Sequence, residues 1–297
     1  MAVTVSTWQD YIALCKPKIV CLIVFTALVG MLLAAPGLVA LPLLISATLG
    51  IGLAAASAAA INHVVDRKTD ALMARTQKRP LPKGNLSTRG ATIFAAVLCV
   101  ISMVVLALCV NALTALLTFI SLIGYGVIYS MFLKRATPQN IVIGGAAGAA
   151  PPVLGWTAVS NSLDPHALLL FLIIFAWTPP HFWALAIARR KDYENADIPM
   201  LPVTHGLEFT RLHILLYTLL LFIVTLLPYL TGMSGITYLF GALTLGGGFL
   251  YFTVKLLKTA EEATAMRTFS YSIWYLIGLF AVLLADHYIP ALTHLVL

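Results

Sequence analysis

The sequence predicts an all-α polytopic membrane protein, a bundle of nine transmembrane helices with the N-terminus in the cytoplasm and the C-terminus outside. Of the 297 residues, 61% are hydrophobic and only 10% are charged, and the mean hydropathy is +0.97. This composition excludes an ordinary soluble domain. Nine apolar runs each have about the ~20 residues that a spanning helix needs. The basic residues between these runs indicate the direction in which each helix crosses.

The span count follows from the apolar runs and from the charges between them. The runs cover residues 18–35, 39–62, 91–110, 112–132, 140–159, 166–188, 212–231, 235–257 and 270–289. With nine crossings, all 18 lysines and arginines fall on one side, which the positive-inside rule assigns to the cytoplasm. One span more or fewer would distribute the later charges over both sides. We therefore predict a single intramembrane domain, residues 1–297, in a bacterial-type cytoplasmic (inner) membrane.

Two pairs of prolines lie inside predicted spans. Pro151 and Pro152 fall in the fifth apolar run, and Pro179 and Pro180 fall in the sixth. A proline removes an amide donor and its ring clashes with the preceding turn. The sequence therefore predicts that both helices are interrupted and bent at these positions.

An acidic cluster lies at the end of the second apolar run. Asn62, Asp66 and Asp70 are spaced by four residues, so on a helix of ~100° per residue their side chains share one face. Carboxylates on a membrane helix are costly and usually mark a cation site or a pathway. Oxygen ligands favour a hard ion, and Mg²⁺ binds well to one or two carboxylates when phosphate oxygens complete its shell. An ordinary solvated helix end with paired charges is the alternative.

Two charged connections, about residues 63–90 and 189–211, lie on the predicted cytoplasmic side. The first places Arg75 and Arg79 shortly after the acidic cluster, and the second repeats this mixture of bases and acids in residues 189–197. Bases beside an acidic metal cluster suit a polyphosphate, which needs both. We expect the two connections to converge on one bound diphosphate, although either alone could be an ordinary charged loop.

A diphosphate site at a membrane surface indicates a lipid diphosphate as the ligand. If the lipid is allylic, metal binding allows the diphosphate to leave as a stabilised anion, and an allylic cation remains in the apolar interior. The protein must then exclude water until an electron-rich acceptor attacks. A cation transporter is the alternative from another class, but it would place acidic residues near the bilayer midplane, not at helix ends. We expect no nucleic-acid partner.

Several motifs resemble the UbiA-type intramembrane prenyltransferase superfamily. The superfamily pattern is N-x-x-x-D-x-x-x-D at residues 62–70, followed by M-x-R-T-x-x-R-P-L at residues 73–81. Further stretches resemble one branch, the protoheme IX farnesyltransferases. They are residues 16–19, Tyr129, residues 134–135, 137–145, 177–183 and 192–202. The T-P-P-H-F-W and D-Y-x-x-A-x-I-P-M-L-P stretches are specific to this branch.

The resemblance implies an activity, a cofactor and partners. The branch transfers a farnesyl group from farnesyl diphosphate to a vinyl group of haem b, with addition of water, which gives haem O for terminal oxidases. Mg²⁺ would be the cofactor and haem b a substrate. Membrane lipid and proteins of haem processing or terminal oxidase assembly are the expected partners. The nearest alternative is prenyl transfer to an aromatic quinone precursor, which needs the same diphosphate site and a different acceptor pocket.

The resemblance also implies roles for individual residues. The catalytic carboxylates would be Asp66, Asp70 and Asp192. The metal ligands would be Asn62, Asp66, Asp70, Asp192 and Asp197. The diphosphate would be held by Asn62, Arg75, Arg79, Lys134 and Lys191. Other branches carry K-D-x-x-D-x-x-x-D in the second connection, whereas here Asp197 follows Asp192 at a spacing of five, so Asp192 is the stronger candidate.

Two residues are candidates for binding haem. His181 follows the second proline pair, where a bend would aim it into the bundle as a ligand for iron. Lys18 would pair with a propionate. A hydrogen-bonded packing histidine and a topology-setting lysine are the alternatives.

Overall fold

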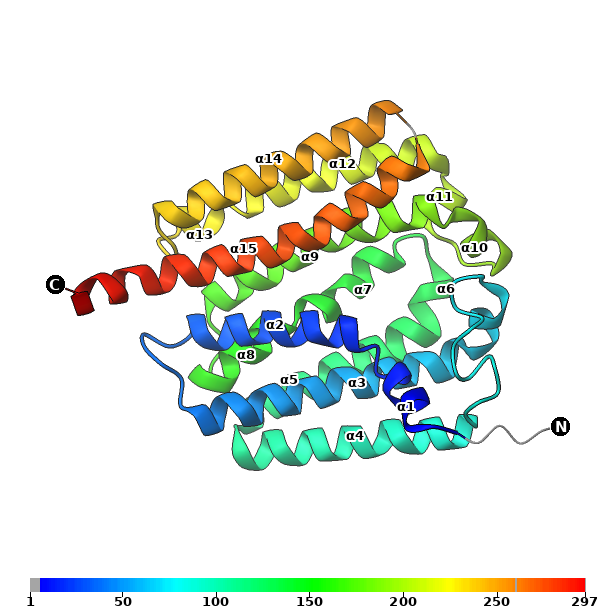
Figure 1. Ribbon diagram of the computed structural model, residues 1–297, viewed down its shortest axis with the longest axis horizontal. Coiled ribbons are helices and arrows are strands. Elements are labelled where there is room, and N and C mark those ends of the chain that lie inside the picture. The colour runs from blue at the N-terminus through cyan, green and yellow to red at the C-terminus, as the bar shows by residue number, and fades with distance from the viewer. Residues whose placement is uncertain (1–5, 260, 297) are drawn as a thin grey trace.

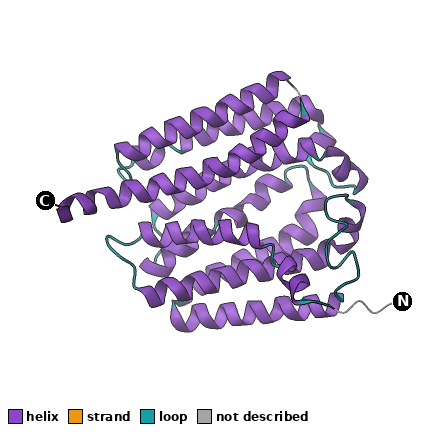
Figure 2. Cartoon of the chain, viewed as in Figure 1, coloured by secondary structure: helices purple, strands orange, loops and turns teal. Residues whose placement is uncertain are grey.

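The structure is a computed structural model that describes residues 6–259 and 261–296, with side chains as far as residue 289. All regular elements in these residues are helices, and no strand occurs among them (Figures 1 and 2). The helices of the first half are α1 (Trp8–Leu14), α2 (Pro17–Leu33), α3 (Leu41–Leu72), α4 (Thr88–Cys109), α5 (Ala112–Ile123), η1 (Gly124–Leu133), α6 (Lys134–Ala136), α7 (Asn140–Ala149) and α8 (Pro151–Ser160). Those of the second half are α9 (Pro165–Ala188), α10 (Arg190–Asn195), α11 (Leu201–Thr204), α12 (Gly206–Val224), α13 (Leu227–Leu230), α14 (Ile236–Thr259) and α15 (Glu262–Val296).

The number of membrane spans agrees with the sequence prediction. Within the described residues, eight helical segments are long and apolar enough to cross a membrane, and α1 with α2 makes a ninth that bends by 52°. The prediction of a nine-helix bundle is confirmed. Successive spans run in opposite directions, so the connections after α3, α9 and α14 lie at the end where α1 lies, and α15 ends at the other (Figure 1). The side of the membrane that each end faces stays a prediction.

Several helices are longer than the apolar runs that predicted them. α3 continues about ten residues past the second run to Leu72, and α15 begins at Glu262, eight residues before the ninth run. Hydropathy detects only the part of a helix that can face lipid. The polar end of α3 stays helical because its side chains are buried against partners inside the protein, as described below.

The two proline pairs have different effects. α7 ends at Ala149 and α8 begins at Pro151, so the predicted interruption is present in the fifth span. α9 runs from Pro165 to Ala188 without interruption, so the break predicted at Pro179 and Pro180 is wrong. α7, α12 and α15 all pack against α9. Such neighbours stabilise a proline-containing membrane helix in its continuous form.

Two buried hydrophobic clusters hold the helices and the polar connections of the bundle together. One lies between α2, α9, α14 and α15, with Trp177, Tyr238, Phe249, Tyr275 and Phe280 among its members. The other lies at the polar end of the bundle, with Met73, Trp183, Tyr193, Met200 and Ile214 among its members. The second cluster joins the connection after α3 to α9, α10, α11 and α12. Packing therefore holds the two charged connections against one another.

The contact between α2 and α8 gives the first testable prediction. A Cβ atom added at Gly155 would collide with the backbone carbonyl of Ala27, and one added at Gly30 would collide with that of Pro152. Since backbone cannot move aside as a flexible side chain can, Gly155→Ala should lower the free energy of unfolding by about 1–3 kcal/mol. Thermal unfolding in detergent measures this loss. Gly148→Ala is the control, because a Cβ there meets nothing within 4 Å. Equal stability of the two variants would contradict the close crossing.

Candidate active site

α3 carries the predicted acidic face. The helix continues through Asn62, Asp66 and Asp70, and these side chains are only 5%, 1% and 2% exposed. Two buried carboxylates require compensating charge or hydrogen bonds, because burial of an unpaired charge is costly. The surrounding elements supply both.

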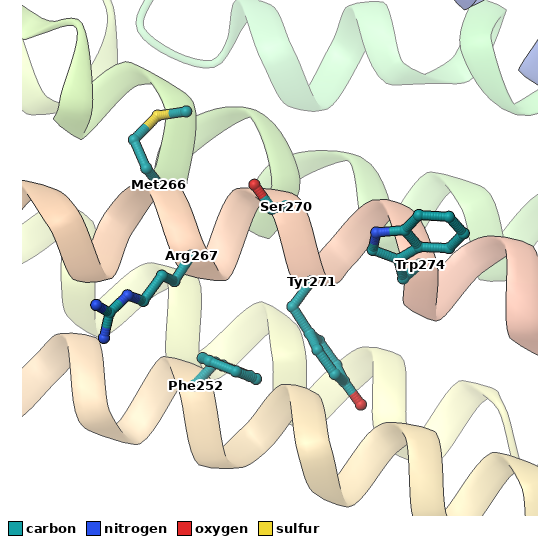
Figure 3. Close-up of a pocket in the computed structure, with 6 residues that line it drawn as sticks. All are labelled: Phe252, Met266, Arg267, Ser270, Tyr271 and Trp274. Atoms are coloured by element: carbon teal, nitrogen blue, oxygen red, sulfur yellow. The ribbon is translucent and has the colours of Figure 1, made fainter.

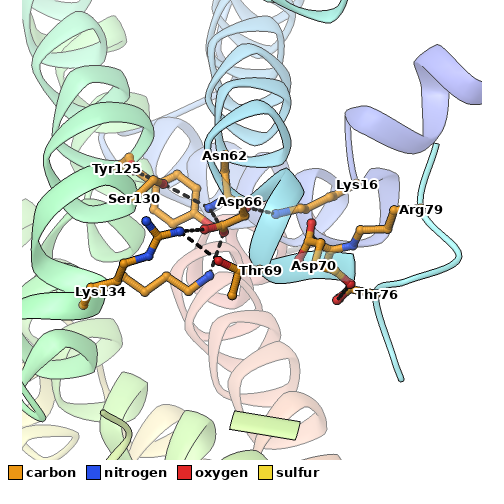
Figure 4. Close-up of polar contacts among 11 residues, drawn as sticks. Lys16, Asn62, Asp66, Thr69, Asp70, Thr76, Arg79, Tyr125, Ser130 and Lys134 are labelled. Atoms are coloured by element: carbon orange, nitrogen blue, oxygen red, sulfur yellow. Dashed lines mark hydrogen bonds and ion pairs between the residues drawn. The ribbon is translucent and has the colours of Figure 1, made fainter. Parts of the chain in front are cut away.

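Asp66 lies at the centre of a hydrogen-bonded network (Figure 4). Its Oδ2 lies 2.7 Å from Lys134 Nζ and accepts a hydrogen bond of 2.9 Å from Asn62 Nδ2. Asn62 Nδ2 also donates to Ser130 Oγ at 3.0 Å, and Asn62 Oδ1 accepts from Lys16 Nζ at 2.5 Å. The network thus joins α3 to the start of α2 and to the end of η1. Charge-assisted bonds of this kind are stronger than bonds between neutral groups.

Lys134 reaches Asp66 from the end of an unusual helix. η1 is a π-helix of ten residues, and Ser130 within it accepts the bond from Asn62. π-helical turns are rare and often occur at functional sites. Arg135 follows Lys134, donates to Thr69 at 2.8 Å and lies 3.9 Å from Asp66. Two cations from this connection therefore approach the acidic face.

Asp70 is paired by a loop that returns to its own helix. Thr76 Oγ1 donates to the backbone carbonyl of Asp70 at 2.9 Å, and a turn joins Thr76 N to Met73 O. This turn brings Arg79 Nη1 to within 2.7 Å of Asp70 Oδ2 (Figure 4). Arg79 therefore pairs with Asp70 and also lines the cavity beside the acidic face that is described below.

The second charged connection lies against the first. The backbone N–H of Ala74 donates to Asp192 Oδ1 at 3.3 Å, and Tyr193 packs in the same buried cluster as Met73. Burial raises the pKa of the Tyr193 hydroxyl, and the positive charge of Arg75 partly opposes this rise. The two connections predicted to converge are therefore in contact.

Other residues of the second connection are less well placed. Lys191 and Asp197 are exposed, and Asp197 has left-handed backbone with φ of 51° in the turn after α10. Within the part of the chain that the structure describes, neither side chain makes a hydrogen bond or ion pair with α3, so their predicted roles stay predictions.

A cavity of about 300 Å³ lies beside the acidic face. It is lined by Ala13, Lys16, His63, Arg75, Lys78, Arg79 and Pro80. Four of these side chains are cationic and none is acidic. Arg75 and Arg79 were predicted, whereas Lys16, His63 and Lys78 were not assigned to the diphosphate. The K-P-K-I stretch and the position of His63 next to Asn62 were the available signals.

A second hollow lies elsewhere on the bundle. Its volume is about 400 Å³, and it lies between α14 and α15 (Figure 3). It is lined by Phe252, Met266, Arg267, Ser270, Tyr271 and Trp274. None of these is a predicted site residue, so this hollow does not bear on the acidic cluster.

The donor set fits Mg²⁺ when a phosphate ligand is present. Asp66 Oδ1 is buried, lies 3.9 Å from the Arg135 guanidinium and has no hydrogen-bond partner among the described residues, so one carboxylate oxygen remains for a cation. In the described part of the chain, no group of three or more His, Cys, Asp or Glu side chains is placed to hold a metal by itself. Mg²⁺ commonly binds through one or two carboxylates with substrate phosphates. The residues therefore fit a metal that arrives with, or is completed by, a diphosphate.

His181 has a defined hydrogen-bonding state. Its ring lies between Trp177 and Phe269, with centroid distances of 4.1 Å and 4.6 Å, and it is 7% exposed. Nδ1 lies 2.6 Å from Ser272 Oγ, whose only hydrogen is donated to Phe269 O at 2.6 Å. Nδ1 is therefore the protonated nitrogen, and Nε2 carries a lone pair. Lys18 is exposed in the first turn of α2.

Comparison with known proteins now identifies the family. Residues 23–283 match the UbiA prenyltransferase family. The chain belongs to this family. Over 283 residues it is 62% identical to a protein of Methylococcus capsulatus named protoheme IX farnesyltransferase, with 95% of each chain covered. This UbiA-family chain is accordingly a membrane prenyltransferase, as the sequence motifs predicted.

Solved structures support the fold of this family member. A structure described as digeranylgeranylglyceryl phosphate synthase in membranes is similar with a TM-score of 0.77 at 19% identity, covering 94% of this chain and 98% of the other. A UbiA homologue from Archaeoglobus fulgidus bound to GPP and Mg²⁺ is similar with a TM-score of 0.63 at 17% identity, covering 92% and 99%. The predicted fold is thus confirmed by UbiA-fold neighbours.

Proposed function

We propose that the chain transfers a farnesyl group from farnesyl diphosphate to a vinyl group of haem b, with addition of water, and so makes haem O. The observation that carries the diphosphate half is the contact of Asp192 with the backbone N–H of Ala74, in the connection that directly follows the α3 acidic face and lines a cavity with four cations. The choice of haem b as acceptor is supported by 62% identity to a relative named protoheme IX farnesyltransferase.

The metal-binding set that we propose comes from both connections. It consists of Asn62, Asp66, Asp70, Asp192 and Asp197, and the catalytic carboxylates are Asp66, Asp70 and Asp192. When bound there, Mg²⁺ supplies positive charge that stabilises the departing diphosphate. The homologue that binds GPP and Mg²⁺ supports this choice of metal.

The diphosphate-binding set that we propose is basic. It consists of Arg75, Arg79, Lys134 and Lys191, together with the amide of Asn62. Arg79 and Lys134 lie 2.7 Å from Asp70 and Asp66, so they are already held at the acidic face. Bound phosphate oxygens would give these cations a second set of acceptors.

The apolar bundle protects the reactive group. After the carbon–oxygen bond to the diphosphate breaks, the electron pair leaves with the diphosphate and a farnesyl cation remains. The vinyl group of haem b attacks this cation, and water adds to the cation that results on the haem side chain and loses a proton to the surrounding water. Buried clusters along the first and second halves of α9 exclude water from the first of these steps.

The acceptor would be held by His181 and Lys18. The geometry of His181 leaves Nε2 as the nitrogen that can bind iron, because Nδ1 is engaged with Ser272. Lys18, exposed at the start of α2, would pair with a propionate. We further propose that the site faces the cytoplasm across the inner membrane, and that haem-processing or terminal oxidase assembly proteins exchange haem with the chain.

Product analysis tests the proposed function. Purified protein is incubated with haem b, farnesyl diphosphate and Mg²⁺, and the extracted haem is measured by mass spectrometry. We expect the mass of the hydroxyethylfarnesyl product. If this product is absent and an aromatic quinone precursor is prenylated in a parallel reaction, haem b is the wrong acceptor and the quinone precursor is the right one.

The role of His181 gives the second prediction. His181→Ala should change the optical spectrum of bound haem b and weaken its binding by at least about tenfold, because the iron loses an imidazole ligand. Optical titration of the purified variant with haem b measures both effects. His205→Ala is the control, because His205 is exposed and bonds only to its neighbour Thr204 through Nδ1. An unchanged spectrum and affinity in His181→Ala would end the assignment.

A further inference from the structure

His63 is a buried polar residue that the proposed set of site residues does not use. It follows Asn62 on α3, and the helical turn directs its side chain ~100° from that of Asn62 and to within ~20° of that of Asp70. The side chain is only 2% exposed. Neither Nδ1 nor Nε2 has a hydrogen-bond partner in the described part of the chain. Buried polar groups normally have partners, so an imidazole whose two nitrogens are unpartnered within the protein is available to bind a ligand.

The surroundings of His63 indicate the charge of that ligand. His63 lines the cavity of about 300 Å³ together with Lys16, Arg75, Lys78 and Arg79. The lining contains four cations and no carboxylate. Like charges gathered around one cavity repel one another, and a bound anion removes this repulsion. The two observations are independent: the unpartnered imidazole calls for a hydrogen-bonding ligand, and the cationic lining calls for an anion.

The imidazole of His63 can accept a hydrogen bond, which the surrounding cations cannot do. A neutral histidine has one N–H donor and one acceptor nitrogen, whereas lysine and arginine only donate. The N–H can donate to a phosphate oxygen, while the other nitrogen accepts from a neighbouring ammonium or guanidinium group. His63 would then fix the direction of that cation as well as one oxygen of the anion.

We propose that His63 is a diphosphate-binding residue, with one ring nitrogen donating to a diphosphate oxygen in the cavity and the other accepting from a cation of its lining. This inference rests on the proposed function, because the diphosphate is that of the prenyl substrate. It adds a neutral contact beside Asp70, at the edge of the α3 acidic face that borders the basic cavity. The diphosphate is thereby held both by the metal at the carboxylates and by the lining of this cavity.

The test compares variants that keep or remove the hydrogen-bonding groups without changing charge. His63→Gln retains a donor and an acceptor, whereas His63→Leu and His63→Met remove both. Isothermal titration with inorganic diphosphate in MgCl₂ measures binding, and steady-state kinetics with farnesyl diphosphate measures KM and kcat. His213→Leu is the control, because His213 is a half-buried histidine on α12 that does not line this cavity, and its Nδ1–H donates to the backbone carbonyl of Phe209.

We expect His63→Leu and His63→Met to weaken diphosphate binding about 10- to 100-fold and to raise KM more than they lower kcat. His63→Gln should bind within a few-fold of the wild type. The inference would be overturned if the Leu and Met variants bound diphosphate as strongly as the wild type. It would also be overturned if His63→Gln lost as much affinity for diphosphate as these two variants. If the wild type itself binds no diphosphate and forms no prenylated product, both the proposed function and the role of His63 are wrong. If the wild type forms product and the variants bind diphosphate as strongly as it does, only the role of His63 is wrong.

Discussion

Replacing Asp66 with asparagine will lower turnover by about 10³-fold or more, while the chain remains folded and inserted. Asp66 is 1% exposed, binds Lys134 at 2.7 Å and keeps Oδ1 free of hydrogen bonds. Asparagine has the same shape but no charge. The substitution therefore removes the negative charge of a metal ligand and leaves Lys134 without its anionic partner, while the packing around α3 changes little.

Steady-state assays with haem b and farnesyl diphosphate measure this loss, and circular dichroism with size-exclusion chromatography checks the fold. Glu208→Gln is the matched control, because Glu208 is an exposed acid in the first turn of α12. It should retain wild-type turnover. Full activity of Asp66→Asn in the presence of Mg²⁺ would remove Asp66 from the metal assignment.

Removal of divalent cations is expected to abolish turnover completely and reversibly. No group of three or more His, Cys, Asp or Glu side chains in the described residues is placed to hold a metal alone. The metal therefore depends on phosphate oxygens to complete its shell, and it should be weakly held when the diphosphate is absent. A chelator will then remove it easily from the resting protein.

The measurement is turnover in excess EDTA, followed by titration with MgCl₂. Activity should fall to background and return when Mg²⁺ exceeds the chelator. EDTA that has been saturated with Mg²⁺ beforehand serves as the control and should not inhibit. Undiminished turnover in metal-free chelator would contradict a metal-assisted departure of the diphosphate.

The sequence predicted the number of spans well because two independent signals agreed. Apolar runs gave the positions of the helices, and all 18 basic residues fell in connections on one side. Helix ends were predicted less well. Hydropathy placed the end of the second span at residue 62, whereas α3 continues to Leu72 because Asp66 and Asp70 are buried against cations. Proline rules predicted the break before Pro151 but not the continuity of α9.

Contacts between distant segments were the part of the site that the sequence could not supply. Lys16 bonds to Asn62 across 46 residues, and Ser130 accepts from Asn62 across 68. Spacing rules reach only a few turns along one helix. The spacing of Asn62, Asp66 and Asp70 could therefore be recognised, whereas the lining of the basic cavity depends on how the α1–α2 segment, α3 and the connection after α3 pack together. The hydrogen bond between His181 Nδ1 and Ser272 Oγ spans 91 residues and could not be predicted for the same reason.

The central claim is that the α3 acidic face and Asp192 act on one diphosphate. Isothermal titration with inorganic diphosphate in MgCl₂, on the wild type, Asp70→Asn, Asp192→Asn and the double variant, tests it most directly. We expect one diphosphate per chain, a loss of affinity in each single variant, and a loss in the double variant that differs from the sum of the two by at least about 0.5 kcal/mol, because coupled residues are not additive. Wild-type affinity in Asp192→Asn, or strictly additive losses, would contradict the claim.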